Sequence, residues 1–515
     1  MASLIGSDLR MITFDLTKAG RRLEPAIFNG AHLFAQDEIP VRGQLQIKNG
    51  HLLCIRHSDV PIGLATLWDV HDCGKIFLPT TRLPERDKPY NLAVELARAR
   101  LLRINHKREE WGMADPKLNE EHLEQIDNAL DNFIKALCCL DEPQKAAQLA
   151  DQALVLALKG GEAMTLAHAK IFLERRALAQ GFGRHAFGCC LDPLRMKDLD
   201  YRNHVKENFH FVTIPISWRQ LQPEEHKLQF ELLDECVQWL NRNRIAVKVG
   251  PLVGFAPAYL PDWLYIWEND FEQVREMAYD FVTAVVNRYG SKVQAWDVIS
   301  GMNAENCFKF TFEQIIEMTR SVALAAKRSS PRSLVLVEIT EPWGEYYAQN
   351  QRTVPPIIYA DMVGQSGVPF DGFGIKLRFG RGSAGMRARD LLDISSLLDR
   401  FAIFQKKVHL AAVQVPSEID PRDANAKAPD PGYWQGPWKP DIQAQWLALI
   451  YQIALSKPFV ETVTWNDLAD NPKGILAAGG LMTQDLQPKP ALLRLQQLKG
   501  RLVRSTPRPR PKTAP

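Results

Sequence analysis

The sequence contains no apolar run of the roughly 18–20 residues that a membrane-spanning helix needs, so it predicts no membrane span. Its net charge is only +3, because 63 Lys and Arg nearly balance 60 Asp and Glu. Nucleic-acid-binding proteins usually have a concentrated basic face, so no nucleic-acid partner is expected. The first ten residues lack the basic start and the apolar stretch of a secretory signal, and we therefore expect a cytoplasmic protein.

The sequence also lacks motifs for metal sites, disulfide frameworks and nucleotide sites. The eight cysteines include two vicinal pairs but no C-x-x-C repeat, which argues against a zinc site and against a disulfide framework. The 12 histidines show no H-E-x-x-H or other ligand spacing, so no metal is expected. No G-x-G-x-x-G follows the first strand predicted after residue 180, which leaves a nucleotide site without support. We predict no cofactor.

Two short regions precede a long repetitive one. Residues 1–90 contain short apolar runs separated by Gly, Asn and Asp, a pattern typical of a small antiparallel β module. Residues 91–179 change to a helical period, and this helical segment predicts four helices. We expect the third helix at about 143–158 and the fourth at about 163–178.

Residues 180–503 alternate apolar strands with amphipathic helices eight times. Continuous apolar strands are typical of a parallel sheet buried on both faces. Eight βα units predict an α/β fold, a (β/α)8 TIM barrel, whose functional face is built by the loops after the strands. A doubly wound open sheet is the structural alternative, and the basic, Pro-rich residues 504–515 predict a disordered tail. We expect the strands at 186–191, 209–218, 245–254, 293–300, 334–339, 372–377, 408–415 and 460–465.

Tryptophans and carboxylates gather where these predicted strands end. Aromatic rings offer apolar faces to the C–H groups of a pyranose ring, while carboxylates and amides bind its hydroxyl groups. The pattern favours a sugar ligand, an oligosaccharide or polysaccharide, held by Trp218, Trp263, Trp343, Trp434 and Trp465. Alternatively, these tryptophans fill gaps between helices and loops, although the segment Tyr433–Trp438 favours exposed aromatics.

Four segments resemble glycoside hydrolase family 10, the endo-1,4-β-xylanase family. SWRQLQP at 217–223 is similar to the family's M-K-W-x-x-L-x-P, and LPDWL at 260–264 is similar to its P-x-W-L. WDVI at 296–299 matches the start of W-D-V-V-N-E, and residues 480–491 resemble the closing G-L-L-F-D…P-K-P-A. The resemblance covers about residues 180–500 and implies a barrel that cleaves with retention, using two glutamates about 5–5.5 Å apart.

The positions of these two glutamates hold residues without a carboxylate. Where the family has N-E after W-D-V-V, this sequence has Ser300-Gly301, and the nucleophile position falls on Ala412. General acid–base catalysis alone contributes about 10²–10⁴ in rate, so their loss predicts that the family's own mechanism is missing. Other sugar-binding positions of the family fall on Ser217, Gly250, Phe255, Lys376 and Arg378.

Four other glutamates are candidate catalytic residues: Glu305, Glu341, Glu345 and Glu418. Two of them with a wider gap would permit an inverting reaction through water. Alternatively, they form hydrogen bonds or ion pairs with Lys376, Arg378 or loop amides. Cations at Lys376 and Arg378 would lower nearby carboxylate pKa values and suit a negatively charged ligand such as a uronic-acid sugar.

The sequence is compatible with three functions. The protein is a hydrolase or reworked relative that acts on a β-linked polysaccharide or oligosaccharide, a non-catalytic carbohydrate-binding protein, or a pseudoenzyme scaffold that holds a protein partner. We favour the xylanase-like fold with altered or lost hydrolysis and a sugar ligand. The N-terminal β module suggests a carbohydrate-binding module. Buried tryptophans would favour the scaffold, because a sugar cleft needs open ring faces.

Overall fold

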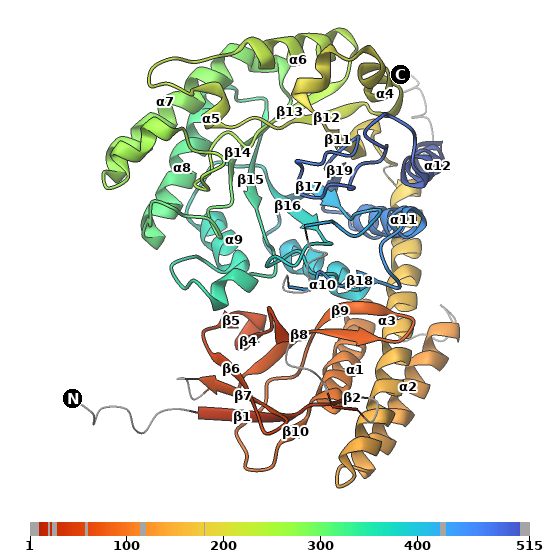
Figure 1. Cartoon of the computed structure of the whole chain (residues 1–515). Helices are drawn as coiled ribbons and strands as arrows, with labels where there is room; N and C mark the ends of the chain where they lie inside the picture. Colours follow the sequence, from red (N-terminus) through yellow and green to blue (C-terminus); the bar gives the residue numbers. More distant parts are fainter. Residues whose placement is uncertain are drawn as a thin grey trace, which may run out of the picture.

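Eight parallel strands close into a barrel in a computed structural model that describes residues 10–18, 21–22, 28–56, 60–113, 120–179, 181–422 and 429–504 (Figure 1). The last strand pairs with the first, so the barrel has no open edge. This closure confirms the predicted TIM barrel and excludes the doubly wound sheet. The strands are β11 (Phe187–Cys190), β12 (Phe211–Ile214), β13 (Ala246–Val249), β14 (Ala295–Ser300), β15 (Leu334–Ile339), β16 (Gly372–Arg378), β17 (Lys407–Gln414) and β19 (Val460–Trp465).

Helices surround the barrel (Figure 1), and apolar residues at helical spacing are buried on them. In α8, for example, Ile315, Val322 and Ala326 are buried at helical spacing, while Thr311 caps the first turn and accepts a hydrogen bond from the amide of Gln314. No helix in the described part of the chain is long and apolar enough to cross a membrane. The helices are α4 (Leu199–Asn208), α5 (Trp218–Leu221), α6 (Glu231–Arg242), α7 (Phe271–Tyr289), α8 (Phe312–Ser329), α9 (Pro356–Gln365), α10 (Leu391–Ala402), α11 (Pro440–Ser456) and α12 (Pro490–Arg504).

The N-terminal β module consists of two sheets that lie beside the barrel (Figure 1). One sheet has the order β10-β1-β7-β6, and the other has the order β18-β9-β8-β4-β5. The strand β18 (Tyr433–Trp434) comes from the loop after barrel strand β17, so the barrel supplies an edge strand to the module. The remaining strands are β1 (Arg10–Asp15), β4 (His32–Phe34), β5 (Pro40–Val41), β6 (Gln44–Lys48), β7 (His51–Arg56), β8 (Gly63–Val70), β9 (Gly74–Pro79) and β10 (Tyr90–Asn91), with a hairpin of β2 (Thr17–Lys18) and β3 (Arg21–Arg22).

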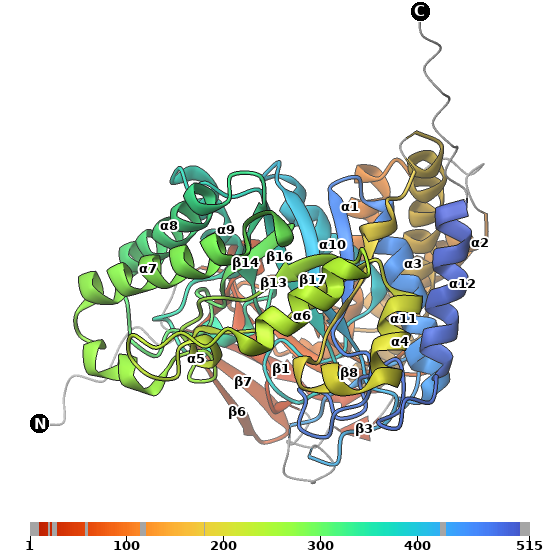
Figure 2. The same cartoon turned by 90° about the horizontal axis from the view of Figure 1, so that it is seen from above.

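The helical segment contains α1 (Leu92–Glu110), α2 (Glu120–Cys138) and α3 (Pro143–Ala179). The expected break between a third and a fourth helix is wrong, because α3 runs unbroken through 37 residues. Its glycines serve close packing. A Cβ on Gly160 would lie 2.9 Å from Cγ1 of Ile126 in α2, and one on Gly161 would lie 3.0 Å from Nη2 of Arg100 in α1. Helix α3 continues past the module and packs beside α11, which in turn packs on α12 (Figure 2).

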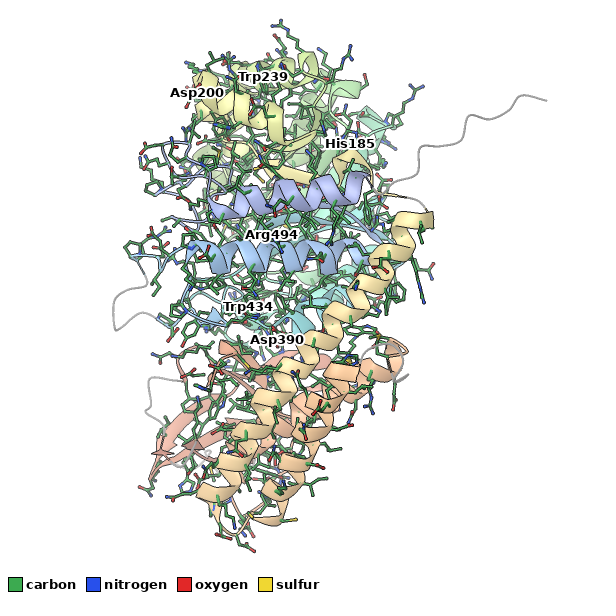
Figure 3. All side chains as sticks on the ribbon, turned by 90° about the vertical axis from the view of Figure 1, so that its right-hand side faces the viewer. His185, Asp200, Trp239, Asp390, Trp434 and Arg494 are labelled. Atoms are coloured by element: carbon green, nitrogen blue, oxygen red, sulfur yellow. The ribbon has the colours of Figure 1, made fainter. Side chains whose placement is uncertain are left out.

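Two ion pairs, one buried and one partly buried, join α1 of the helical segment to the barrel. Nη2 of Arg100 lies 2.8 Å from Oδ1 of Asp390, and Nη1 of Arg103 lies 3.0 Å from Oδ1 of Asp393. Asp390 and Trp434 lie beside α3, where the module meets the barrel (Figure 3). Removing one partner from a buried pair is costly, because the other charge stays uncompensated. The parts of the chain on either side of the predicted boundary near residue 180 are therefore tightly joined. Apart from Arg504, the predicted tail lies outside the described residues.

Candidate functional site

A cavity of about 610 Å³ opens at the carboxyl ends of the barrel strands. This is the face on which TIM-barrel proteins place their functional residues, because the loops after all eight strands converge there. Its size lies within the usual range for small-molecule sites. The polar residues that line it are Asp192, Arg195, Tyr259, Asp297, Glu338, Lys376, Arg378, Asn466, Asp467, Asp470 and Asn471, among others.

Two ion pairs form the buried floor of this cavity. Nζ of Lys248 lies 2.8 Å from Oδ2 of Asp297, and Nζ of Lys376 lies 2.5 Å from Oε1 of Glu338. The hydroxyl of Ser300 donates a hydrogen bond of 2.5 Å to the same Glu338 oxygen and accepts one of 3.1 Å from Lys376. The two carboxylates and two ammonium groups balance in charge.

Burial and charge move the pKa values of these two carboxyl groups apart. Burial raises the pKa of Asp297 to about 6, and repulsion from Glu338 adds to this effect against the attraction of Lys248. Burial also acts to raise the pKa of Glu338, but the attraction of Lys376 and Lys248 outweighs it and holds that pKa below its usual value. A proton arriving at this floor therefore goes to Asp297 before Glu338.

The two positions that the motif resemblance assigns to glutamates lie at the ends of β14 and β17. Ala412 lines the cavity and stands opposite Lys376 in the register of β17 and β16. Gly301 has a φ of +73°, and a Cβ there would lie 3.2 Å from Oε2 of Glu305. Neither residue carries a carboxylate, so a retaining pair does not exist at these two positions.

The predicted cations differ in their surroundings. Lys376 is neutralised by Glu338, as the ion-pair alternative expected. Arg378 lines the cavity, is partly exposed, and has no carboxylate oxygen within 4 Å of its guanidinium among the described residues. Arg378 is thus the only one of the two with a charge available to a ligand.

Glu345 and Glu418 lie away from the cavity. Glu345 is buried at the junction with the module, where its carboxylate lies 2.9 Å from Nη1 of Arg387 and 2.5 Å from Nη2 of Arg389. Although burial acts to raise the pKa of Glu345, Arg389, His32 and Arg387 lower it below its usual value. Glu418 is exposed and does not line the cavity. The structure therefore gives Glu345 a structural role and leaves Glu418 on the surface.

Glu305 lies beside Gly301 and Glu341 lies beside Gly385, and neither lines the cavity. Burial raises the pKa of Glu341 to about 8, with repulsion from Glu345 and Glu305 adding to it. Its Oε2 is buried and has no hydrogen-bond partner among the described residues. The structure thus brings Glu305 close to Gly301 and keeps Oε2 of Glu341 buried.

None of the five tryptophans lines the cavity, which corrects the predicted stacking residues. The rings of Trp218, Trp434 and Trp465 are at most 1% exposed. Trp263 and Trp343 are half-buried, and the guanidinium of Arg389 covers the ring of Trp343 at 4.3 Å.

Each buried ring has a packing role. Trp218 stacks on Phe281 at 5.0 Å between ring centroids, and the indole N–H of Trp465 donates to the carbonyl of Gly479. Trp434 belongs to β18, and its indole N–H donates to Oε1 of Glu162 at 2.7 Å. The predicted exposed loop at Tyr433–Trp438 begins instead as a strand of the N-terminal sheet. Tyr201 and Tyr259 are the aromatic residues that do line the cavity.

Sequence reasoning missed Asp192 and Asp467 as site residues. Asp467 lies two positions after β19, and Asp192 lies two positions after β11, so both occupy strand ends on the functional face. Oδ2 of Asp467 accepts hydrogen bonds from Gln414 at 2.5 Å and from Asn466 at 2.9 Å. Their positions directly after predicted strands were the signal that could have identified both aspartates as site residues.

Comparison with known proteins agrees with this fold. The family description "Glycosyl hydrolase family 10" matches residues 175–495. Endo-1,4-beta-xylanase B of Thermotoga neapolitana is 22% identical over 317 residues, 58% of this chain and 83% of that protein. An endo-1,4-beta-xylanase/feruloyl esterase of Xylanibacter ruminicola is 21% identical over 308 residues, which cover 55% of this chain and 41% of that protein.

Among solved structures, native xylanase 10B of Thermotoga maritima has a TM-score of 0.48 and 17% identity, and the match covers 64% of this chain and 98% of that chain. The GH10 structure from Paenibacillus barcinonensis has a TM-score of 0.49 and 17% identity, with 65% and 99% covered. The family match extends over more than half of the residues and includes all eight barrel strands. The chain therefore belongs to glycosyl hydrolase family 10.

Proposed function

We propose that this protein binds a β-linked oligosaccharide, of the xylan type that its relatives' names indicate, in the cavity at the carboxyl ends of the barrel strands. The observation that carries the proposal is the cavity itself, which combines this position with hydrogen-bonding groups from several strands. The absence of a carboxylate at Gly301 and Ala412 supports a further part of the proposal, that binding is not followed by the family's retaining hydrolysis.

Hydrogen bonding, rather than stacking on tryptophan, supplies the affinity in this proposal. Arg378 and Asn466 present donors to the cavity, Asp467 presents an acceptor, and Tyr259 presents a hydroxyl group. These groups suit the vicinal hydroxyls of a sugar, which both donate and accept. A carboxylate on the sugar would have Arg378 as its partner.

A protein scaffold is the second candidate function, and one observation favours it. The predicted sugar-stacking rings of Trp218, Trp434 and Trp465 are buried and serve packing. In that case the cavity would have no sugar ligand, and the barrel surface would hold a protein partner.

Isothermal titration of the full chain with xylotriose, and with a xylo-oligosaccharide that carries glucuronic acid, tests the proposal. We expect binding that Arg378→Ala weakens by about 10–100-fold, since a hydrogen bond to a charged group contributes about 1.5–3 kcal/mol. Glu418→Gln is the matched control, because Glu418 is exposed and outside the cavity. Absence of binding to both sugars would contradict the proposal and favour the scaffold.

A further inference from the structure

Two aspartates that follow neighbouring barrel strands line the same cavity. Strands β11 and β19 are adjacent, with Cys189 opposite Trp465 in their register. Asp467 follows Trp465 by two residues and Asp192 follows Cys189 by three, so both residues lie at the same part of the barrel rim. Both line the cavity.

Among the carboxylates of this cavity that are at least partly buried, Asp192 and Asp467 are those without a cation as partner in the described part of the chain. Asp297 pairs with Lys248, Glu338 pairs with Lys376, and Oδ1 of Asp470 lies 2.6 Å from Nζ of Lys489. Within the described residues, no Lys, Arg or His nitrogen lies within 4 Å of the Asp192 or Asp467 carboxylate. The remaining unpaired carboxylate of the lining, Asp485, is exposed on the loop before α12.

The two aspartates differ in their hydrogen-bond partners. Burial raises the pKa of Asp467, and Asp192 adds to the effect, against hydrogen bonds from Asn466 and Gln414 and the charge of Arg378. Both amide groups donate to Oδ2, and among the described residues no group donates a hydrogen bond to Oδ1. Oδ1 of Asp192 accepts a hydrogen bond of 3.0 Å from the amide of Leu194.

A buried carboxylate oxygen in the floor of the cavity also indicates a ligand. Asp297 is only 1% exposed and lines the cavity, and no described residue forms a hydrogen bond with its Oδ1. A buried carboxylate oxygen left without a donor costs free energy, and a sugar hydroxyl in the cavity would supply that donor.

We propose that Asp467 and Asp192 form a relocated acid–base pair that hydrolyses the bound β-glycoside with inversion. Asp467 gives its proton to the glycosidic oxygen as the bond from that oxygen to the anomeric carbon breaks. A water molecule attacks the anomeric carbon from the opposite side and gives a proton to Asp192. The products are the leaving alcohol and a sugar with the α configuration, and one water is consumed. Proton return from Asp192 to Asp467 through solvent completes the cycle.

This inference rests on the proposed binding of a β-linked sugar, and the test separates the two. The full chain is incubated with xylotetraose, and the anomer formed first is identified by proton NMR, beside titration calorimetry with the same sugar. We expect the α anomer. Binding without any hydrolysis, or a β anomer as first product, would overturn the inference and leave the binding proposal standing. Absence of binding would overturn both.

Two variants distinguish the acid from the base. Asp467→Asn is expected to lower hydrolysis of xylotetraose by about 10²–10⁴, but to retain most activity on 2,4-dinitrophenyl β-xyloside, whose leaving group needs no proton. Asp192→Asn is expected to lose activity on both substrates, while Glu418→Gln keeps both. This contrast identifies a proton donor even if the variants lose stability, because a folding defect would affect both substrates equally. Equal loss on both substrates in Asp467→Asn would overturn its role.

Discussion

Ala412 shows how one residue changes the chemistry that a barrel position permits. A methyl group stands at the end of β17, 4% exposed and opposite Lys376, whose charge Glu338 already balances. A carboxylate placed there would add a negative charge to a buried floor whose own charges already balance. Restoring one glutamate does not restore the pair, because Gly301 carries no acid.

Ala412→Glu is therefore expected to gain no retaining hydrolysis and to lower the free energy of unfolding by about 1–3 kcal/mol. Product analysis by NMR and denaturant unfolding would measure the two effects. Ala412→Gln, which has a similar size without the charge, is the control. Formation of a β-configured product by Ala412→Glu would contradict the expectation.

Glu345 illustrates a glutamate at a strand-end loop whose role is structural. Its two arginine partners, Arg387 and Arg389, are buried with it. Glu345→Gln is expected to lower the free energy of unfolding by about 3–5 kcal/mol, because it leaves buried guanidinium charge uncompensated. Sugar affinity should stay unchanged, since Glu345 does not line the cavity. Unchanged stability with lost binding would instead indicate a direct role at the site.

The stability that Glu345 provides depends on pH in a definite direction. The pKa of Glu345 in the folded protein is lower than its usual value. Its contribution to the free energy of unfolding is therefore fully present at a pH above the usual pKa, and it disappears as the pH falls through the folded pKa. The difference between the wild type and Glu345→Gln should therefore shrink on acidification.

At the scale of elements, α3, β18 and the start of α10 meet at Glu162. Its Oε1 accepts hydrogen bonds from the indole of Trp434 at 2.7 Å and from the amide of Leu391 at 3.1 Å. Burial raises the pKa of Glu162 to about 7, with repulsion from Asp390 adding to the shift. The folded state therefore holds a proton there that the unfolded chain releases at lower pH.

Glu162→Gln is expected to stabilise the protein at pH 8, because a neutral amide keeps both acceptor contacts without the carboxylate's charge. Stability of the wild type falls as the pH rises from about 4.5 to about 7, so the gain should vanish below that window and reach about 1–3 kcal/mol above it. Denaturant unfolding from pH 4 to 8 measures the difference. A constant difference across this range would contradict the expected titration of Glu162.

For the whole molecule, charge pairs join the helical segment to the barrel, and a shared sheet joins the β module to it. The pairs of Arg100 with Asp390 and of Arg103 with Asp393 cross the junction, and β18 pairs with β9. A barrel separated from the module would expose these charges and an open sheet edge.

We therefore expect the full chain to unfold in one cooperative transition. Far-ultraviolet circular dichroism and tryptophan fluorescence should give coincident denaturation curves, and Asp390→Asn should shift both curves together. Two separated transitions would show that the module and the barrel are stable independently, against the expectation from their buried contacts.

The alternation of apolar strands and amphipathic helices was sufficient to predict the barrel, because strands buried on both faces need apolar residues wherever they pair. The motifs around Trp218 and Trp296 were sufficient to predict the family. The break in α3 was predicted wrongly because glycine occurs both at helix ends and where two helices pack closely. Gly160 and Gly161 are of the second kind.

The members of the site were decided only by the tertiary structure. Sequence places a residue at a strand end but does not fix which way its side chain turns or which charge balances it. Trp434 turns into a neighbouring sheet, Glu345 toward two arginines, and Asp467 into the cavity. These outcomes depend on contacts between segments far apart in the chain, such as Trp434 with Glu162, and such contacts exist only after folding.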